Sequence, residues 1–211
     1  MDETLGQNVT SGTQTPLSRA LQGDTGPSGP QPLDAYKLAR RAFLAGERVD
    51  MKTIAEQLGI SRVTLYRWVG SRAALLGEVM AELAITSAKA ERIRTEANDG
   101  AALSHVASWL VQTLMAFEPM QHLLETEPDF ALRVLTTSKG PTSARITDYW
   151  TSEIRTEEAA GTYNPPLPAP DLAYLIVRLS ESFVYKQVIA GEAADPALAK
   201  RVFDMIINPD R

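Results

Sequence analysis

The chain of 211 residues contains no cysteine, which excludes disulfide bonds, thiolate chemistry and any zinc site built on cysteine. It also lacks an apolar run near the roughly 20 residues that a membrane helix requires. The first residues, MDETLGQNVTSG, have neither the basic start nor the apolar stretch of a secretory signal. These absences predict a cytoplasmic protein that does not enter a membrane.

Sequence patterns typical of enzymes are absent as well. There is no phosphate-binding glycine loop, nucleophile elbow, HExxH pattern or catalytic carboxylate pair. His105 and His122 stand alone, without another histidine or a carboxylate at metal-ligand spacing. We therefore expect no enzymatic activity, no metal site and no cofactor.

The charge is unevenly distributed along the chain. The net charge is −5, but residues 33–76 contain eight Lys or Arg and four Asp or Glu. That segment is therefore +4 and the remainder −9. A basic segment attached to an acidic remainder suits a protein that binds DNA with one part only.

Residues 1–32 are rich in Gly, Thr, Ser, Gln and Pro and end in GDTGPSGPQP. Such a composition buries too little apolar surface to offset chain entropy, so we expect a disordered tail. Arg19 is its only basic residue, which makes it a poor arm for DNA.

Residues 33–78 show the pattern of a three-helix DNA-binding domain. A supporting helix is predicted over 33–45 from its helical apolar period. Asp50 is a helix N-cap candidate, Gly59 ends that second helix, and Ser61 caps the next, which ends at Gly70. Two short helices joined by a glycine turn form a helix-turn-helix, whose second helix enters the DNA major groove.

Residues 79–211 are predicted to form a second, helical domain. A long helix is expected over about 72–97, and further helices near 101–117, 119–137 with a break near Pro128, 142–159, 171–191 and 195–207. The proline-rich stretch 162–170 must lie outside helices. No segment alternates like a strand, so the fold class is all-α.

The pattern I-A-x-x-L-G-I-S-x-x-T-L-Y-x-x-V followed by S-R-x-x-L-L, over 54–76, resembles the tetracycline-repressor (TetR) family of bacterial regulators. The resemblance implies a ligand-responsive repressor whose helical C-terminal domain binds a small-molecule effector and dimerises. Two departures stand out: the connection from Phe43 to Ile54 is shorter, and Asp50 replaces a Thr or Ser that touches phosphate. Lys52 could make that phosphate contact instead.

The stretch SESFVYKQVIAGEAAD, over 180–195, together with the upstream DYW and PPLPAPDLAYLI, resembles a QsdR-like subgroup of the same family. Those regulators are found beside enzymes that degrade quorum-sensing lactones. This resemblance implies a lactone or a related acyl compound as the effector.

Candidate DNA contacts lie on and around the recognition helix. Arg62, Thr64 and Arg67 are base-reading candidates, because arginine can bond guanine through two donors and threonine can meet a thymine methyl. Candidates for phosphate contacts are Lys52, Ser61, Tyr66 and Arg72. Trp68 either contacts phosphate or covers the core. For each of the other candidates the alternative is an ordinary solvated or packing residue with no role in DNA binding.

Aromatic residues of the second domain could line an effector pocket or simply fill a core or a dimer contact. They are Trp109, Phe117, Phe130, Trp150, Phe183 and Tyr185. Glu181 lies in an otherwise apolar helix, where it either orients a ligand or pairs with Arg178 or Tyr185.

The helices near 171–191 and 195–207 are apolar on more than one side, which requires a covering partner. The resemblance implies that they form the interface of a homodimer. Such a dimer presents two recognition helices about 34–36 Å apart to a palindromic double-stranded operator. An alternative remains open: a DNA-binding protein of the same fold that responds to a protein partner, or to no small molecule.

Overall fold

The computed structural model describes residues 15–23, 29–95, 99–136, 141–190 and 195–209. The described residues form helices joined by turns and loops and contain no strand, which confirms the all-α prediction. The helices are α1 (Pro16–Leu21), α2 (Pro32–Leu44), α3 (Met51–Leu58), α4 (Arg62–Val69), α5 (Arg72–Thr95), α6 (Gly100–Ala116), α7 (Glu118–Thr126), α8 (Pro128–Thr136), α9 (Pro141–Ala159), α10 (Ala169–Ala190) and α11 (Pro196–Ile207). Among these residues no helix is long and apolar enough to cross a membrane.

The predicted helices agree with α2–α11 to within a few residues, and the break at Pro128 separates α7 from α8. Two expectations are wrong in part. The proline-rich stretch 162–170 was predicted to lie outside helices, but α10 begins at Ala169 and holds Pro170 in its first turn, where the missing N–H of proline costs no helical hydrogen bond. Within the tail predicted to be disordered over 1–32, Pro16–Leu21 forms α1 and the side chain of Leu17 is fully buried. Residues 1–14 and 24–28 lie outside the described part, so the prediction for them stays as it was.

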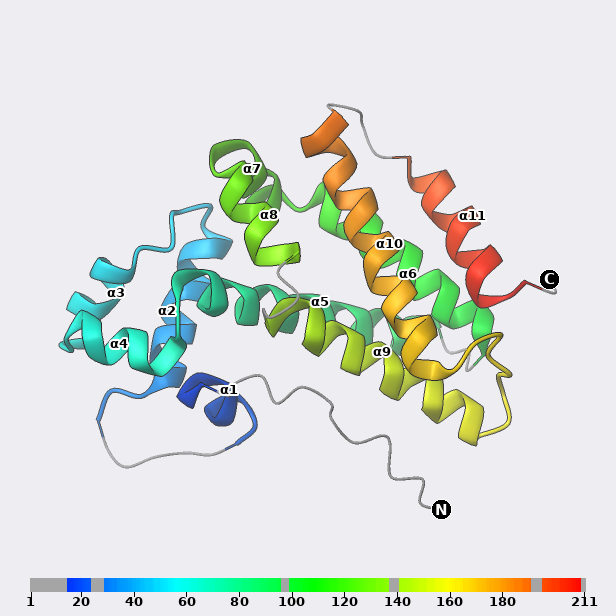
Figure 1. The fold of residues 1–211 in the computed structure, drawn as a ribbon, viewed down its shortest axis with the longest axis horizontal. Helices are drawn as coiled ribbons and strands as arrows, with labels where there is room; N and C mark the ends of the chain where they lie inside the picture. Colours follow the sequence, from blue (N-terminus) through cyan, green and yellow to red (C-terminus); the bar gives the residue numbers. More distant parts are fainter. Residues whose placement is uncertain (1–14, 24–28, 96–98, 137–140, 191–194, 210–211) are drawn as a thin grey trace, which may run out of the picture.

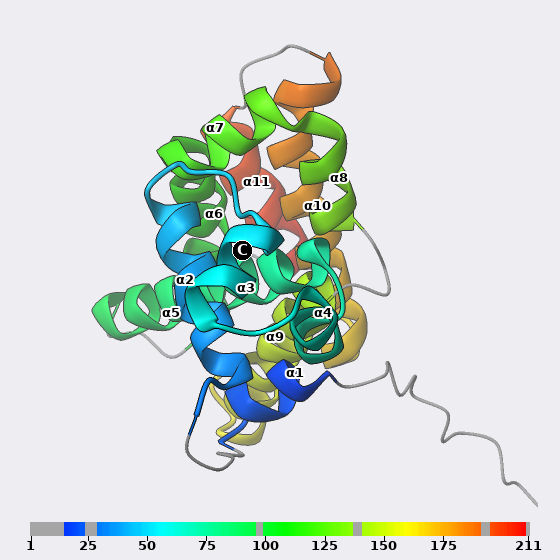
Figure 2. The ribbon, with the colours of Figure 1, turned by 90° about the vertical axis from the view of Figure 1, so that its left-hand side faces the viewer.

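Four short helices build one end of the molecule, which we call the head. There α2 packs against α3 and α4, and α1 packs against α2 and α4. Figure 2 views the molecule from this end, with α3 and α4 in front. The apolar sides of these helices meet in one core, which includes Ala39, Phe43, Ile54, Leu65 and Val69.

The long helix α5 runs from the head into the rest of the molecule, which we call the body (Figure 1). In the body α5 packs against α6 and α9, α10 packs along α9, and α11 packs along α6. A second core fills the space between them around Leu103, Trp150, Leu172, Ile176 and Phe203. Because α5 packs against helices of both parts, it connects the head to the body.

Candidate DNA-binding face and effector cavity

Side-chain caps fix the turn between α3 and α4. The Asp50 carboxylate accepts a hydrogen bond from the backbone N–H of Thr53 at 2.8 Å, and this bond is the main reason that the pKa of Asp50 lies below its ordinary value. Gly59 ends α3 with a φ of 65°, a left-handed conformation that glycine adopts without strain. The Ser61 hydroxyl then accepts from the N–H of Thr64 at 3.1 Å and starts α4. The turn therefore forms as the sequence predicts.

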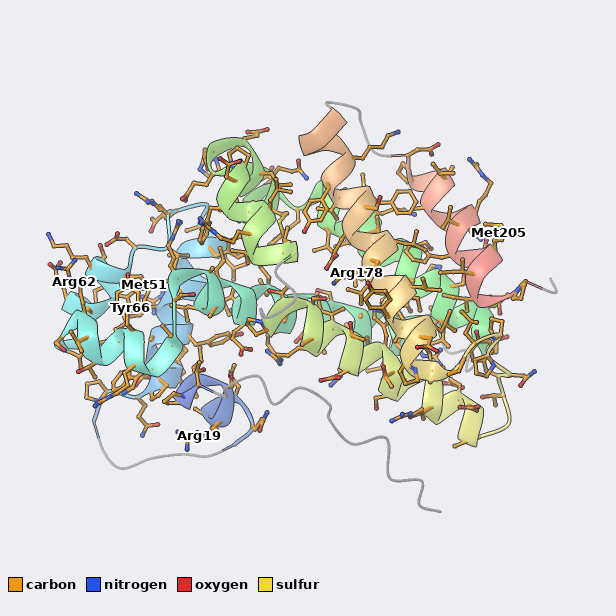
Figure 3. The ribbon with its side chains drawn as sticks, viewed as in Figure 1. Arg19, Met51, Arg62, Tyr66, Arg178 and Met205 are labelled. Carbon is orange, nitrogen blue, oxygen red and sulfur yellow. The ribbon has the colours of Figure 1, made fainter. Side chains whose placement is uncertain are left out.

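One side of α4 is buried and the other faces solvent. Leu65 and Val69 lie in the core of the head, whereas Arg62, Tyr66 and Arg67 are exposed. Figure 3 shows Arg62 and Tyr66 at the outer end of the head, away from the body. This exposed face carries side chains that can donate hydrogen bonds to a major groove.

Val63 lies on the same face and was not among the residues predicted from the sequence. Its side chain is 80% exposed, although valine is an apolar residue. An exposed branched methyl pair beside Arg62 and Arg67 is suited to contact a thymine methyl. Its position between Arg62 and Thr64, at the start of the recognition helix, is the sequence feature that could have indicated this contact.

The remaining candidates near α4 differ in their surroundings. The hydroxyls of Thr64 and Ser61 lie 3.0 Å apart, so each already has one partner. Trp68 is half-buried and packs against the core of the head, which agrees with the prediction that it covers the core. Lys52 is exposed, with its ammonium 3.8 Å from the Glu56 carboxylate.

Arg72 is turned toward the body. Its Nη1 and Nη2 each donate to one oxygen of Glu127 at 2.6 Å, and its Nε donates to the Val49 carbonyl at 2.6 Å. Its guanidinium carbon also lies 3.9 Å from the centre of the Phe130 ring. This arrangement occupies Arg72 inside the protein and gives no support to the predicted phosphate contact.

A narrow cavity of about 70 Å³ lies between head and body. Four of the seven candidate effector residues line it: Phe117, Trp150, Glu181 and Tyr185. Phe130 and Phe183 do not line it and lie in the first and second cores. Trp109 is not among its lining residues and packs instead, half-buried, against the second core.

Most of the cavity wall comes from residues that the sequence did not single out. They are Phe43 of α2, Met80, Leu83 and Ala84 of α5, Leu110 and Leu114 of α6, Met120 of α7, Leu135 of α8, Thr142 and Ile146 of α9, and Val177, Ser180 and Val184 of α10. No local pattern marks them, because seven helices bring them together. The wall includes Phe43, so the cavity touches the DNA-binding head itself.

Few polar groups face this apolar cavity. The Tyr185 hydroxyl is buried and has no hydrogen-bond partner among the described residues. Glu181 accepts a hydrogen bond from Arg178 at 2.8 Å, which confirms the pairing proposed from the sequence. Burial raises the pKa of Glu181 to about 7, against the opposing effect of Arg178. Figure 3 places Arg178 midway along α10.

Apolar side chains remain exposed on the outer helices of the body. Tyr174 and Leu175 project from α10, and Leu198 and Met205 project from α11. Met205, at the outer side of α11 in Figure 3, is 66% exposed. These residues belong to the helices predicted to form the dimer interface.

Comparison with known proteins agrees with this architecture. Residues 100–208 match the family described as the tetracyclin repressor-like C-terminal domain. This match covers α6 to α11, the helices that form most of the cavity and the exposed apolar surface. No curated protein matches the chain.

Two solved structures share the fold. The transcriptional repressor QsdR of R. erythropolis, from the TetR family, superimposes with a TM-score of 0.78 and 23% sequence identity, over 83% of this chain and 93% of that one. The TetR family repressor AlkX of Dietzia sp. strain DQ12-45-1b, implicated in n-alkane biodegradation, gives a TM-score of 0.57 and 23% identity, over 87% and 96%. At these identities the likeness concerns the fold.

Proposed function

This chain belongs to the tetracycline repressor-like (TetR) family, and from that premise we propose that it is a homodimeric repressor released from its operator by a small molecule. Proteins of this family are transcription regulators and not enzymes. What is proposed beyond the family is the palindromic operator, the dimer and the effector.

The exposed face of α4 supports operator binding. Arg62 and Arg67 offer paired donors to base edges, and Tyr66 offers a hydroxyl next to them. Leu65 and Val69 anchor the opposite side of the helix in the core, which holds this face in a fixed orientation. Joining two such heads through α10 and α11 would present both helices to a palindrome.

The observation that carries the effector proposal is an apolar cavity lined by Tyr185, whose buried hydroxyl has no hydrogen-bond partner among the described residues. A buried hydroxyl without a partner costs free energy, and a ligand oxygen that accepts a hydrogen bond from it removes that cost. The rest of the wall is almost entirely hydrocarbon. A mainly apolar, uncharged molecule with a carbonyl oxygen fits these surroundings, and a lactone or acyl compound is of this class.

The cavity is too small for such a molecule as it stands. Ligand pockets measure about 300–1,000 Å³, several times the 70 Å³ found here. An effector must therefore push the walls apart, and the walls include Phe43 of the head and Met80 of α5. Phe43 also packs edge-on against Phe117, with ring centres 6.0 Å apart. Binding thus favours a head position that differs from the ligand-free one, which is the differential affinity that a switch requires.

The test is a titration of the protein against DNA from upstream of its own gene and against scrambled DNA, at a stated salt concentration. Tight, salt-sensitive binding to the first alone supports the repressor. Medium-chain γ-lactones are then added: release from DNA is expected, and Tyr185→Phe should need about 2- to 10-fold more lactone, the equivalent of one hydrogen bond. Ser152→Ala, which removes an exposed hydroxyl of α9 outside the cavity wall, is the control and should respond as the wild type does.

Equal, weak binding to both DNAs would refute operator recognition by this head. Specific binding that no lactone, ester or amide of the panel relieves would refute the effector and favour control by a protein partner.

A further inference from the structure

The N-terminal helix α1 lies against the recognition helix and is tied to the body. We propose that α1 is a working part of the DNA-binding head and that it positions α4 through the hydrogen bond from Ser18 to Glu78, which Arg145 holds in place. The inference rests on the DNA-binding function proposed above and goes beyond it, because it assigns a role to a segment that precedes the helix-turn-helix.

Packing places α1 in contact with α4. Leu17 is fully buried in the same core as Leu65 and Val69 of the recognition helix. The Thr15 methyl lies at the end of α4, since a Cβ built on Gly70 would be 3.4 Å from it. In Figure 1, α1 lies below α2, beside that end of α4. A displacement of α1 therefore changes the support under α4.

A hydrogen bond ties α1 to the long helix α5. The Ser18 hydroxyl donates to Oε1 of Glu78 at 2.8 Å. Glu78 is almost completely buried in the middle of otherwise apolar α5 residues. A buried carboxylate requires partners for both of its oxygens, because an unpaired charge inside a protein is costly. Ser18 is thus one of the groups that offset the cost of burying the Glu78 carboxylate.

The other partner of Glu78 comes from the body. Arg145 of α9 donates from Nη1 to Oε2 of Glu78 at 2.9 Å, and its Nη2 donates to Glu82. The helices α5 and α9 are in close contact here: a Cβ on Gly77 would lie 2.6 Å from the Thr142 hydroxyl, so a larger residue would have to displace that side chain. Glu78 therefore joins α1 of the head to α9 of the body.

The connection reaches the cavity. Thr142 and Ile146, on either side of Arg145 in α9, belong to the cavity wall. A shift of α9 on ligand binding moves Arg145, and Arg145 holds the carboxylate on which Ser18 and α1 depend. The same network that supports α4 can thus respond to the state of the cavity.

The experiment compares full-length wild type with Ser18→Ala, which removes the bond to Glu78 and keeps Leu17 in place. The matched control is Ser152→Ala, an exposed serine on α9. Hydrogen exchange of residues 62–69 is measured by mass spectrometry, and affinity is measured for a duplex selected from a random pool by the wild-type protein and for a scrambled duplex.

We expect Ser18→Ala to speed exchange in α4 several-fold and to weaken binding to the selected duplex about 3- to 10-fold, the equivalent of one hydrogen bond, with binding to scrambled DNA unchanged. Ser152→Ala should match the wild type. A general loss of stability would weaken binding to both duplexes equally and would overturn the proposal, as would unchanged α4 exchange or unchanged specific affinity. If the wild type selects no duplex at all, the operator proposal fails, while exchange in α4 still decides whether α1 supports that helix.

Discussion

The ion pair between Arg72 and Glu127 joins the head to the body at the start of α5. Both guanidinium Nη atoms bond the carboxylate at 2.6 Å, a bidentate geometry that fixes direction as well as distance. We expect Glu127→Gln to lower the free energy of unfolding, because the amide cannot accept both bonds and Arg72 keeps a partly buried charge without its counterion.

The expected magnitude follows from burial. Removing one partner of a fully buried pair costs about 3–5 kcal/mol, whereas an exposed pair contributes about 0–1 kcal/mol. The side chains of Arg72 and Glu127 are 17% and 22% exposed, so the pair lies between these limits. We therefore expect Glu127→Gln to lower the free energy of unfolding by about 2 kcal/mol, which lowers the unfolding midpoint by about 4–8 °C in a chain of this length.

The pH dependence gives the pair a second signature. Hydrogen bonds from Arg72 hold the pKa of Glu127 below its ordinary value of 4.5, more strongly than burial raises it. A carboxyl with a lowered folded-state pKa stabilises the protein above its unfolded-state pKa and loses this contribution as pH falls through the folded value. The difference in stability between wild type and Glu127→Gln should therefore be constant from pH 7 to about pH 5 and shrink below pH 4.5.

The assay is denaturant or thermal unfolding followed by circular dichroism at several pH values between 7 and 3. Glu125→Gln, exposed in the last turn of α7 two residues before Glu127, is the control and should unfold as the wild type does. No difference between wild type and Glu127→Gln at pH 7, or a difference that persists undiminished at pH 3, would refute the reasoning.

Two further predictions concern the DNA-binding face and the dimer. Arg62→Ala should cost about 1–3 kcal/mol of operator affinity and relax preference at one base pair, as measured by titration against single-base variants of the operator; unchanged affinity would remove Arg62 from the reading face. Met205→Glu places a charge in the exposed apolar surface of α11 and should shift the protein toward monomers in sedimentation velocity at micromolar concentration. A wild-type dimer that persists undiminished in this variant would move the interface elsewhere, and a stable wild-type monomer would exclude it.

Many helix boundaries could be predicted from interactions between residues close in the sequence. Asp50, Ser61 and Gly59 act within three or four residues of their own positions, so the boundaries of α3 and α4 follow from short-range chemistry. The inward side of α4 follows from the helical period. The exposed positions of Arg62, Tyr66 and Arg67 were predicted for the same reason, as what is left when Leu65 and Val69 turn inward.

The helix α1 escaped prediction because the local composition of its segment is that of a disordered tail. Its stabilising contacts are the burial of Leu17 in the core that α2 and α4 share and the hydrogen bond from Ser18 to Glu78 of α5, and these partners are distant in the sequence. A six-residue helix is not stable alone, so only tertiary packing can form it.

Taken alone, the sequence determined the all-α class, the helix-turn-helix and the residues that α4 exposes to solvent, because caps, glycine turns and helical periodicity act over a few residues. Only the tertiary structure decided that Arg72 pairs with Glu127, 55 residues away, and that Ser18 bonds Glu78, 60 residues away. It also decided that Tyr185 and Phe43 share one cavity while Trp109 lies outside it. Such partners are chosen by which helix surfaces meet, and a single sequence carries no local pattern for a contact between distant helices.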